Sequence, residues 1–440
     1  MSDYLRRILP LSVAGAFVIL PLQPSLAQRA APLPNAASAA GEGFSAERLA
    51  RLDTAMQKAL ADQKVGGMVT LLARNGKVVD FKIYGDAAPG RKMSRDTIFR
   101  IYSMSKVVTG VAMMMLFEEG KWRLDDPVSK FLPELKDLKV ATALDSAGNP
   151  VLVNARRGPT MRELMSHQAG FTYGFTQEPA DSVYRKVQPM NAKGMADYVG
   201  KLAQVPLLYQ PGDRWSYSQA VDVQGAIVEK LSGMRFGDFL AERIFKPLKM
   251  ADTGFFVPQA KLGRVAEVYS NDPKTGALRP GGGFGGGAAS PPVPTAAPAF
   301  ESGGGGLFST VDDYARFAQM LANKGVLDGA RLLAPATVEV MQANVVPAST
   351  LISPTMLSGF SANVGFGMDV QTVINPRAAG RLEGEGTISW EGAAGTWFWA
   401  DPKNDVIFVG MIQNFGRAGP NGFDPVTRPL VYQALIDPKD

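Results

Sequence analysis

The chain reads Tyr102-Ser103-Met104-Ser105-Lys106-Val107 at the point where a strand-like run (97–102) gives way to an apolar pattern of helical spacing (107–117). Ser103 and Lys106 are three residues apart, so on a helix their side chains share one face, one turn apart. A desolvated lysine amine at that spacing can take the serine proton, which makes the hydroxyl a competent nucleophile without a histidine. The segment therefore predicts a nucleophilic serine and its lysine partner at the start of a helix.

The residue types that the chain lacks strengthen this prediction. Cysteine is absent and His167 is the single histidine, which excludes a Cys-His enzyme and argues against a histidine-rich zinc site. No serine lies in a Gly-x-Ser-x-Gly elbow, the context that a nucleophile of the α/β-hydrolase type requires. A serine hydrolase built on this chain must therefore take its base from lysine or tyrosine. No nucleotide, metal or flavin motif is present, so we expect no cofactor.

Length and composition are those of a large enzyme. The chain has 440 residues, of which 46% are hydrophobic and 20% charged, enough for an ample core and two lobes. The net charge of +5 comes without basic blocks. This charge pattern argues against nucleic acid as a partner and leaves a small molecule as the expected one.

The first 27 residues have the pattern of a secretory signal. Two arginines precede an apolar run (8–22), and small residues at 25–27 form a cleavage site. A membrane anchor is the alternative, but the run is short for a span and contains two prolines. We therefore expect a periplasmic or secreted protein without a stable membrane span after signal removal, beginning with a flexible spacer (28–43).

Strand patterns occupy both ends of the chain, and the middle is mostly helical. A helical pattern at 45–63 is followed by strands at 68–73 and 77–84, which flank Asn75-Gly76, the strongest short hairpin signal. The other expected elements are strands at 387–393, 396–400 and 406–413 and helices at 162–165, 220–231, 311–322 and 426–435. This order predicts one antiparallel sheet built from both chain ends, flanked by helices, with a mostly helical lobe inserted.

A segment rich in Gly and Pro (281–306) interrupts the helical middle. It lacks the strand and helix context of a phosphate-binding loop. We expect a surface loop there, and the alternative is a rim over the active site.

With two later segments, Ser103-x-x-Lys106 resembles the motifs of the penicillin-binding and serine β-lactamase superfamily, in the branch that contains class C β-lactamases and family VIII carboxylesterases. The second motif is Tyr217-Ser218-Gln219 and the third is Trp390-Glu391-Gly392, where penicillin-binding enzymes have Lys-Thr-Gly. The likeness runs from about Phe44 to the end of the chain. It implies an α+β fold of the β-lactamase/transpeptidase type.

The resemblance also implies a domain plan. One catalytic domain would span 44–440, with an α/β lobe at about 44–118 and 330–440. A helical lobe would take up about 119–329 and include the loop at 281–306.

Site residues follow from the same resemblance. Ser103 would attack a carbonyl, Lys106 and Tyr217 would share its proton, and the backbone N–H groups of Ser103 and Ala393 would form the oxyanion hole. A phenol beside an ammonium has its ionised form favoured, which suits Tyr217 for proton exchange. The expected substrate-binding residues are Gln219, Trp390, Glu391 and Gly392.

Two departures from the family pattern bear on the substrate. Gln219 is one methylene longer than the usual Asn, and Trp390 replaces a lysine whose charge would pair with the carboxylate of a β-lactam. Short-chain esters are therefore the favoured substrates, with weak β-lactam hydrolysis, unless a cation such as Arg381 restores the charge. The alternatives are a class C-like β-lactamase, a D-Ala-D-Ala carboxypeptidase or D-aminopeptidase acting on amides, and a non-catalytic binding protein on this fold.

Several other residues have plainer interpretations. A literal Lys274-Thr275-Gly276 stands in a polar, turn-forming stretch and is not the third motif. We interpret His167 as a hydrogen-bonding strut. We interpret Asp222 as a helix-surface carboxylate, and the alternative is that it orients a neighbouring residue. Trp397 and Trp399 alternate on a strand and are expected in the core.

Overall fold

The computed structural model describes residues 32–272, 274–283, 290, 292–347, 349–352, 363–417 and 422–438. The expected signal segment (1–27) lies outside these residues. Within them, no helix combines the length and apolar character that crossing a membrane requires.

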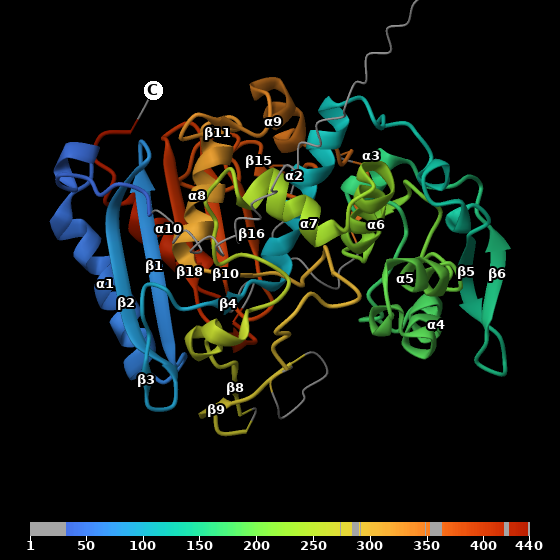
Figure 1. Ribbon diagram of the computed structural model, residues 1–440, viewed down its shortest axis with the longest axis horizontal. Coiled ribbons are helices and arrows are strands. Elements are labelled where there is room, and N and C mark those ends of the chain that lie inside the picture. The colour runs from blue at the N-terminus through green and yellow to red at the C-terminus, as the bar shows by residue number, and fades with distance from the viewer. Residues whose placement is uncertain are drawn as a thin grey trace, which may run out of the picture.

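An eight-stranded antiparallel sheet forms one side of the molecule, on the left in Figure 1. Its strand order is β14-β15-β16-β17-β18-β1-β2-β3, so the two ends of the chain meet at the β18–β1 pair, as the sequence predicts. The strands are β1 (Gly67–Arg74), β2 (Lys77–Ala88), β3 (Arg91–Lys92), β14 (Val364–Phe366), β15 (Gln371–Val373), β16 (Ile388–Glu391), β17 (Trp397–Asp401) and β18 (Val406–Met411). The α+β fold expected from the sequence is confirmed.

The β1–β2 hairpin forms where the sequence predicts it. Asn75 and Gly76 adopt φ of 52° and 73°, the left-handed conformation that a two-residue type I′ turn requires at both positions. Because Asn and Gly tolerate that conformation better than other residues, this pair fixes the register of the two strands.

Helices cover both faces of the sheet. Along β1 the side chains alternate: Met68 and Leu72 pack with α1 (Ala46–Ala61) and α10 (Asp424–Tyr432), whereas Val69 and Leu71 point to the face that carries α8 (Val311–Ala322). Trp397 and Trp399 lie in the cluster under α1 and α10, which confirms their core role. Helix α8 was expected in the helical lobe but packs on β1, β17 and β18.

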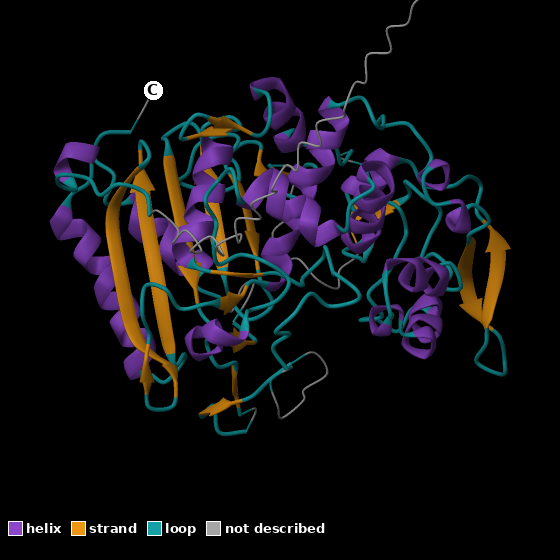
Figure 2. Cartoon of the chain, viewed as in Figure 1, coloured by secondary structure: helices purple, strands orange, loops and turns teal. Residues whose placement is uncertain are grey.

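The helical lobe lies beside the sheet (Figure 2). Its helices are α3 (Met161–Met165), α4 (Pro179–Val187), α5 (Met195–Leu202), α6 (Ala220–Ser232) and α7 (Phe236–Leu240), with the hairpin β5 (Lys139–Leu144) and β6 (Pro150–Asn154) at its outer end. The remaining elements are α9 (Pro335–Gln342), β4 (Phe99–Arg100), β7 (Arg214–Trp215), β8 (Tyr269–Asn271), β9 (Leu278–Pro280), β10 (Phe308–Ser309), β11 (Val326–Leu327), β12 (Ala330–Arg331), β13 (Leu351–Ile352) and β19 (Asn414–Phe415).

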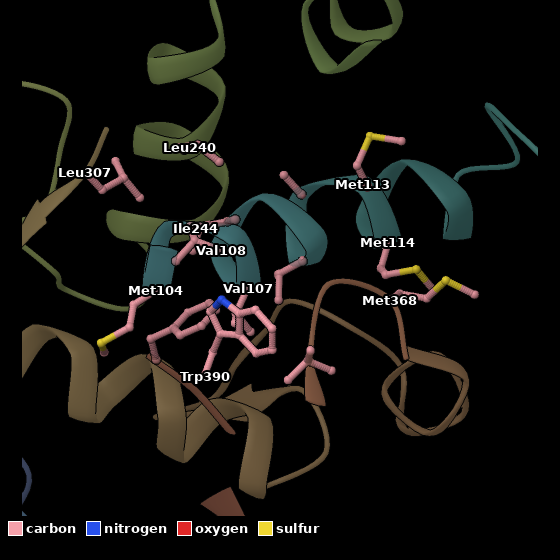
Figure 3. Packing of buried hydrophobic residues seen from close by; sticks show 14 of the residues in the cluster. Met104, Val107, Val108, Met113, Met114, Leu240, Ile244, Leu307, Met368 and Trp390 are labelled. Atoms are coloured by element: carbon pink, nitrogen blue, oxygen red, sulfur yellow. The ribbon is translucent and has the colours of Figure 1, made fainter. Parts of the chain in front are cut away.

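Helix α2 (Ser105–Glu118) is buried in the core and contacts α6 and α9. Every residue from Ser105 to Leu116 is buried, as expected for a helix that is apolar on all sides. Figure 3 shows its side chains packed with Leu240, Ile244 and Trp390, which come from distant parts of the chain. Tight packing of this helix fixes the position of the residues at its start.

The expectation of a flexible spacer is wrong for residues 33–42. Leu33 is buried, Val78 N–H donates to Pro34 O, and Ala36 N–H donates to Val78 O, both at 2.8 Å. The buried carboxylate of Glu42 accepts a hydrogen bond from Lys77 Nζ at 2.8 Å. One apolar anchor and edge pairing with β2 order this segment despite its Ala- and Pro-rich composition.

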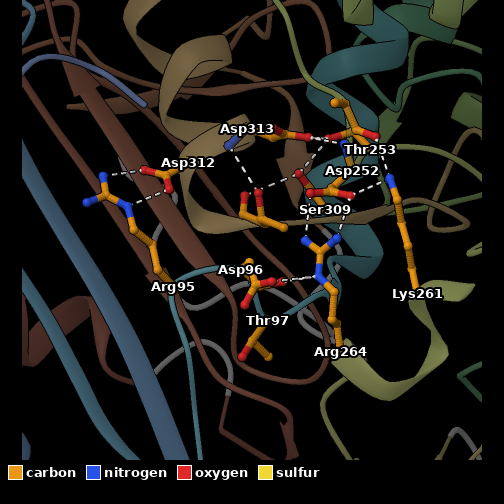
Figure 4. Close-up of polar contacts among 12 residues, drawn as sticks. Arg95, Asp96, Thr97, Asp252, Thr253, Lys261, Arg264, Ser309, Asp312 and Asp313 are labelled. Carbon is orange, nitrogen blue, oxygen red and sulfur yellow. Dashed lines mark hydrogen bonds and ion pairs between the residues drawn. The ribbon is translucent and has the colours of Figure 1, made fainter. Parts of the chain in front are cut away.

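A buried carboxyl group in α8 makes the stability of the protein depend on pH (Figure 4). Asp313 Oδ2 accepts hydrogen bonds from Asp252 N–H at 2.8 Å and from Thr253 Oγ1 at 2.9 Å. Burial raises the pKa of Asp313 to about 7 from an ordinary 3.8. Between these two values the folded state keeps a proton that the unfolded state releases, so the Asp313 contribution to stability falls as pH rises from about 4 to about 7.

We therefore expect Asp313→Asn to become more favourable, relative to the wild type, as pH rises. Asparagine keeps the acceptor oxygen but has no proton to lose. The difference in unfolding free energy between variant and wild type should change by about 2 kcal/mol or more in favour of the variant between pH 4 and pH 8. Urea denaturation at both pH values measures it, and an unchanged difference would show that Asp313 does not titrate in this range.

Candidate active site

Ser103 lies in a short 3-10 turn (Tyr102–Met104) that leads directly into α2. Tyr102 has a φ of 43°, a conformation that costs energy for a side chain of this size and turns the chain sharply before the helix. Lys106, one turn on, is 1% exposed, and its Nζ lies 3.2 Å from Ser103 Oγ. The pair predicted from sequence spacing is thus assembled with the amine in hydrogen-bonding reach of the hydroxyl.

Three groups hold the ammonium of Lys106. Its Nζ donates to Gly304 O at 2.5 Å and lies 4.6 Å from the ring centre of Tyr217 and 5.3 Å from that of Tyr173. Aromatic faces stabilise a desolvated cation. Lys106 is therefore fixed between Ser103, a backbone carbonyl and two phenol rings.

Tyr217, of the second motif, contacts residues of the first and third motifs, Lys106 and Trp390. It sits between β7 and α6, and its ring centre lies 5.0 Å from that of His167, 5.4 Å from that of Tyr173 and 5.7 Å from that of Trp390. The tyrosine motif and the Trp390 segment, 173 positions apart in the sequence numbering, thus meet at Tyr217, whose ring faces Lys106.

The Trp390 segment is the end of β16, and the turn that carries Ser103 packs against this strand. Trp390 is 6% exposed and Glu391 is half-buried opposite Trp397. A Cβ at Gly392 would collide with Thr396 Oγ1 and with Ile101 O. Only glycine therefore lets the strand end come this close to the chain just before Ser103.

Ala393 follows in the β16–β17 hairpin. Gly392 N–H donates to Thr396 O at 2.7 Å and Gly395 N–H to Gly392 O at 2.8 Å, whereas among the described residues the Ala393 N–H has no backbone acceptor. This arrangement suits the oxyanion-hole role expected for Ser103 and Ala393, which stays a prediction.

The side-chain amide of Gln219 is already hydrogen-bonded within the protein. It is fully buried, its Oε1 accepts a hydrogen bond from Tyr198 Oη at 3.2 Å, and its Nε2 donates to Tyr184 Oη. Its amide is thus used within the helical lobe. The longer side chain reaches the two tyrosines instead of the reaction centre.

His167 is a buried residue with a structural hydrogen bond, as expected from the sequence. It is fully buried with a φ of 58°, and its Nδ1 accepts a hydrogen bond from Ser218 N–H at 3.3 Å. Burial, together with the positive charge of Lys106, holds the pKa of His167 well below its ordinary value. A neutral imidazole here orients the tyrosine motif.

Sequence reasoning was wrong about Asp222. It is not a surface carboxylate but a fully buried one, whose Oδ1 accepts hydrogen bonds from Ser302 Oγ at 2.5 Å and from Gly304 N–H at 3.0 Å. Burial raises its pKa, and the charge of Lys106 acts in the opposite direction. Helix α6 is enclosed by α2, α3, α5 and α7, so it has no solvent face at this position.

The surface-loop expectation is also wrong for the end of the segment at 281–306. Gly303 and Gly304 are buried, and Gly304 O is the carbonyl that binds Lys106. A Cβ at position 304 would lie 2.6 Å from Asp222 Oδ2 and 2.7 Å from Tyr173 Oη. The glycines therefore permit close packing behind the lysine.

The structure also places the literal Lys-Thr-Gly segment and Arg381. Lys274 and Thr275 form a turn between β8 and β9, in which both backbone N–H groups donate to Asp272 Oδ1, so this Lys-Thr-Gly is not part of the site. Arg381 pairs with the buried Glu383 at 3.1 Å. Among the described residues, no cluster of three acidic or histidine side chains is arranged to hold a metal ion.

Comparison with known proteins identifies the family of the chain. The beta-lactamase family model matches residues 52–433. Protein Rv1367c of Mycobacterium tuberculosis is 37% identical over 357 residues, 80% of this chain and 86% of the relative. Esterase EstB of Burkholderia gladioli is 31% identical over 371 residues, 80% of this chain and 88% of the esterase.

A solved structure shows the same architecture. EstCE1, described as a hydrolase with promiscuous acyltransferase activity, superposes with a TM-score of 0.72 at 26% identity, covering 88% of this chain and 99% of that protein. The family match spans nearly the whole catalytic region, and the site has the arrangement of a serine hydrolase. The chain belongs to the beta-lactamase family.

Proposed function

We propose that this protein is a carboxylesterase that hydrolyses short-chain esters through an acyl-enzyme on Ser103. The observation that carries the proposal is Trp390, a nearly buried indole packed against Tyr217 where penicillin-binding enzymes have a lysine. An indole supplies no positive charge for the carboxylate of a β-lactam or a D-alanine terminus. An ester without that carboxylate loses nothing at this position.

The geometry supports a two-step acyl transfer. Ser103 Oγ attacks the ester carbonyl while its proton passes to the Lys106–Tyr217 pair, and N–H groups of Ser103 and Ala393 receive the charge that develops on the carbonyl oxygen. The C–O bond to the alcohol breaks and the alcohol leaves with a proton from the same pair. Water then attacks the acyl-serine, with proton transfer in reverse, and releases the carboxylic acid.

The relatives support the ester over the β-lactam. EstB is named an esterase. Weak β-lactam hydrolysis is part of the proposal, because both substrates acylate a serine by the same route.

The test is hydrolysis of p-nitrophenyl butyrate and nitrocefin by the same preparation. Losing a buried charge partner costs about 2–5 kcal/mol, so kcat/KM for the ester should exceed that for nitrocefin by a factor of roughly 30 or more. Ser103→Ala is the control and should abolish both activities. Comparable or faster nitrocefin turnover would contradict the esterase proposal and favour a class C-like β-lactamase.

A further inference from the structure

Asp222 is a buried carboxylate that the acyl-transfer scheme above does not use. It lies in the first turn of α6, fully buried, and its Oδ1 accepts two hydrogen bonds from a single segment, the 302–306 turn. Burying a carboxylate costs several kcal/mol unless charge or hydrogen bonds compensate. The compensation here comes from that turn and from the charge of Lys106.

The 302–306 turn connects Asp222 to the lysine. Gly304 N–H donates to Asp222 Oδ1 at 3.0 Å, and the carbonyl of the same residue accepts the hydrogen bond from Lys106 Nζ at 2.5 Å. Thr109 Oγ1, on the helix of Lys106, donates to Gly303 O at 2.9 Å. The turn is thus held from α6 by Asp222 and from α2 by Thr109, with the Gly304 carbonyl directed at the ammonium.

The glycine at 304 fits this interpretation. The position where a Cβ would stand is bounded by Asp222 Oδ2 and Tyr173 Oη, at 2.6 and 2.7 Å. A side chain would push the turn away from Asp222 and withdraw the carbonyl from Lys106.

We propose that Asp222 is a positioning residue for Lys106: it fixes the 302–306 turn, whose Gly304 carbonyl holds the ammonium beside Ser103, and its charge balances that ammonium. The inference rests on the proposed function, since it deepens the role of the same site. Asp222 touches neither substrate nor Ser103 in this scheme and acts only through the lysine.

Several titratable groups face Lys106, and each bears on the test. Tyr173 and Tyr217 present their rings to its ammonium, and its charge also acts on His167 of the segment after α3 and on Asp369, which packs against Gly110 of α2. Asp369 is fully buried, accepts a hydrogen bond from Gln224 Nε2 at 3.0 Å, and has its pKa raised by burial. Asp222 differs from Asp369 because it alone of the two binds the turn that contacts Lys106.

Two variants separate the hydrogen bonds of Asp222 from its charge. Asp222→Asn keeps an acceptor oxygen for Ser302 and Gly304 and removes the charge, whereas Asp222→Ala removes both. With p-nitrophenyl butyrate, Asp222→Ala should lower kcat by roughly 10²-fold at little change in KM, because a small displacement of a catalytic group costs about that much. Asp222→Asn should recover most of this loss.

The pH profile provides a readout that a purely structural role would not move. Asp222 and Lys106 interact electrostatically, so in both variants, which remove the charge of Asp222, one limb of the kcat/KM profile should move along the pH axis. The matched control is Asp401→Asn, a change at another buried carboxylate that accepts hydrogen bonds from Gly384 N–H and Tyr432 Oη at the far end of β17. It should leave the profile in place.

The outcomes distinguish this inference from the esterase proposal. Two results with an active wild type would overturn the positioning role alone. In the first, both Asp222 variants keep the wild-type kcat. In the second, both variants lose kcat to the same extent, with an unmoved pH profile and a lowered melting temperature. A wild type that does not hydrolyse the ester would overturn the proposed function, and the same variants would then be compared by their rate of labelling with a fluorophosphonate.

Discussion

Replacing Lys106 with methionine is expected to lower kcat for p-nitrophenyl butyrate by about 10³-fold, within the range found for loss of a general acid–base group. The amine lies 3.2 Å from Ser103 Oγ and is held there by Gly304 O, so the serine loses the nearest group with which it can exchange a proton. Methionine keeps most of the buried stem volume and should preserve the packing of α2. Steady-state kinetics with thermal melting measures both effects.

A surface lysine provides the matched control for this substitution. The side chain of Lys246 is 75% exposed and pairs only with Glu242 four residues before it, among the contacts that the structure shows. Lys246→Met should therefore leave kcat within a factor of about two, since exposed pairs contribute little. A folded Lys106→Met variant that kept more than a tenth of wild-type kcat would show that the lysine is not needed for proton transfer.

Tyr217→Phe is expected to lower kcat by about 10²-fold or more with an unchanged melting temperature. The substitution keeps the ring that packs on His167 and Trp390 and that faces the ammonium of Lys106, and it removes only the hydroxyl. The predicted loss therefore reports the proton that the phenol carries. The kinetics of acyl-enzyme formation under single-turnover conditions measures it.

Tyr84→Phe is the matched control for Tyr217→Phe, because it removes a phenol hydroxyl far from the site. Tyr84 lies on β2 under α1 and donates to Asp53 Oδ1 at 2.9 Å, so its loss should affect stability and not turnover. If Tyr217→Phe acylates at the wild-type rate, Lys106 would be the sole base and the shared-proton scheme would be wrong.

The proximity of Ser103 to Lys106 and the outline of the fold were predictable because their determinants are local. Ser103 and Lys106 are one helical turn apart, and Asn75-Gly76 defines a hairpin within four residues of chain. The meeting of both chain ends in one sheet followed from where the strand patterns lie. Strands β14 and β15 were missed because each has only three residues, too few for an alternating pattern to emerge.

The surroundings of Lys106 were not predictable because they depend on contacts between distant segments. Asp222 and Gly304 are 82 residues apart, and Lys106 and Gly304 are 198 apart. A charged residue on a helix is normally exposed, and nothing in the sequence around Asp222 shows that four other helices enclose α6. Tyr173 is not part of any sequence motif, so its contact with Lys106, which its ring makes, could not be predicted.

The composition of residues 281–306 predicted a loop, but it did not predict which part of the loop is buried. Glycine-rich segments are flexible when exposed, but glycine also allows a backbone to pack where a Cβ would collide. Gly303 is of the second kind, since a Cβ there would lie 2.7 Å from Val221 O. Sequence alone cannot separate these two uses of glycine, whereas the structure does so directly.

Labelling with a fluorophosphonate probe tests the role of Ser103 most directly, because the probe reacts with an activated serine and leaves a stable mass tag. Incubation with excess probe, followed by intact-mass measurement and peptide mapping, should show one adduct, on the peptide that contains Ser103. The adduct should be absent in Ser103→Ala and should form far more slowly in Lys106→Met. An unlabelled wild-type protein, or an adduct on a different serine, would contradict the assignment of Ser103 as the nucleophile.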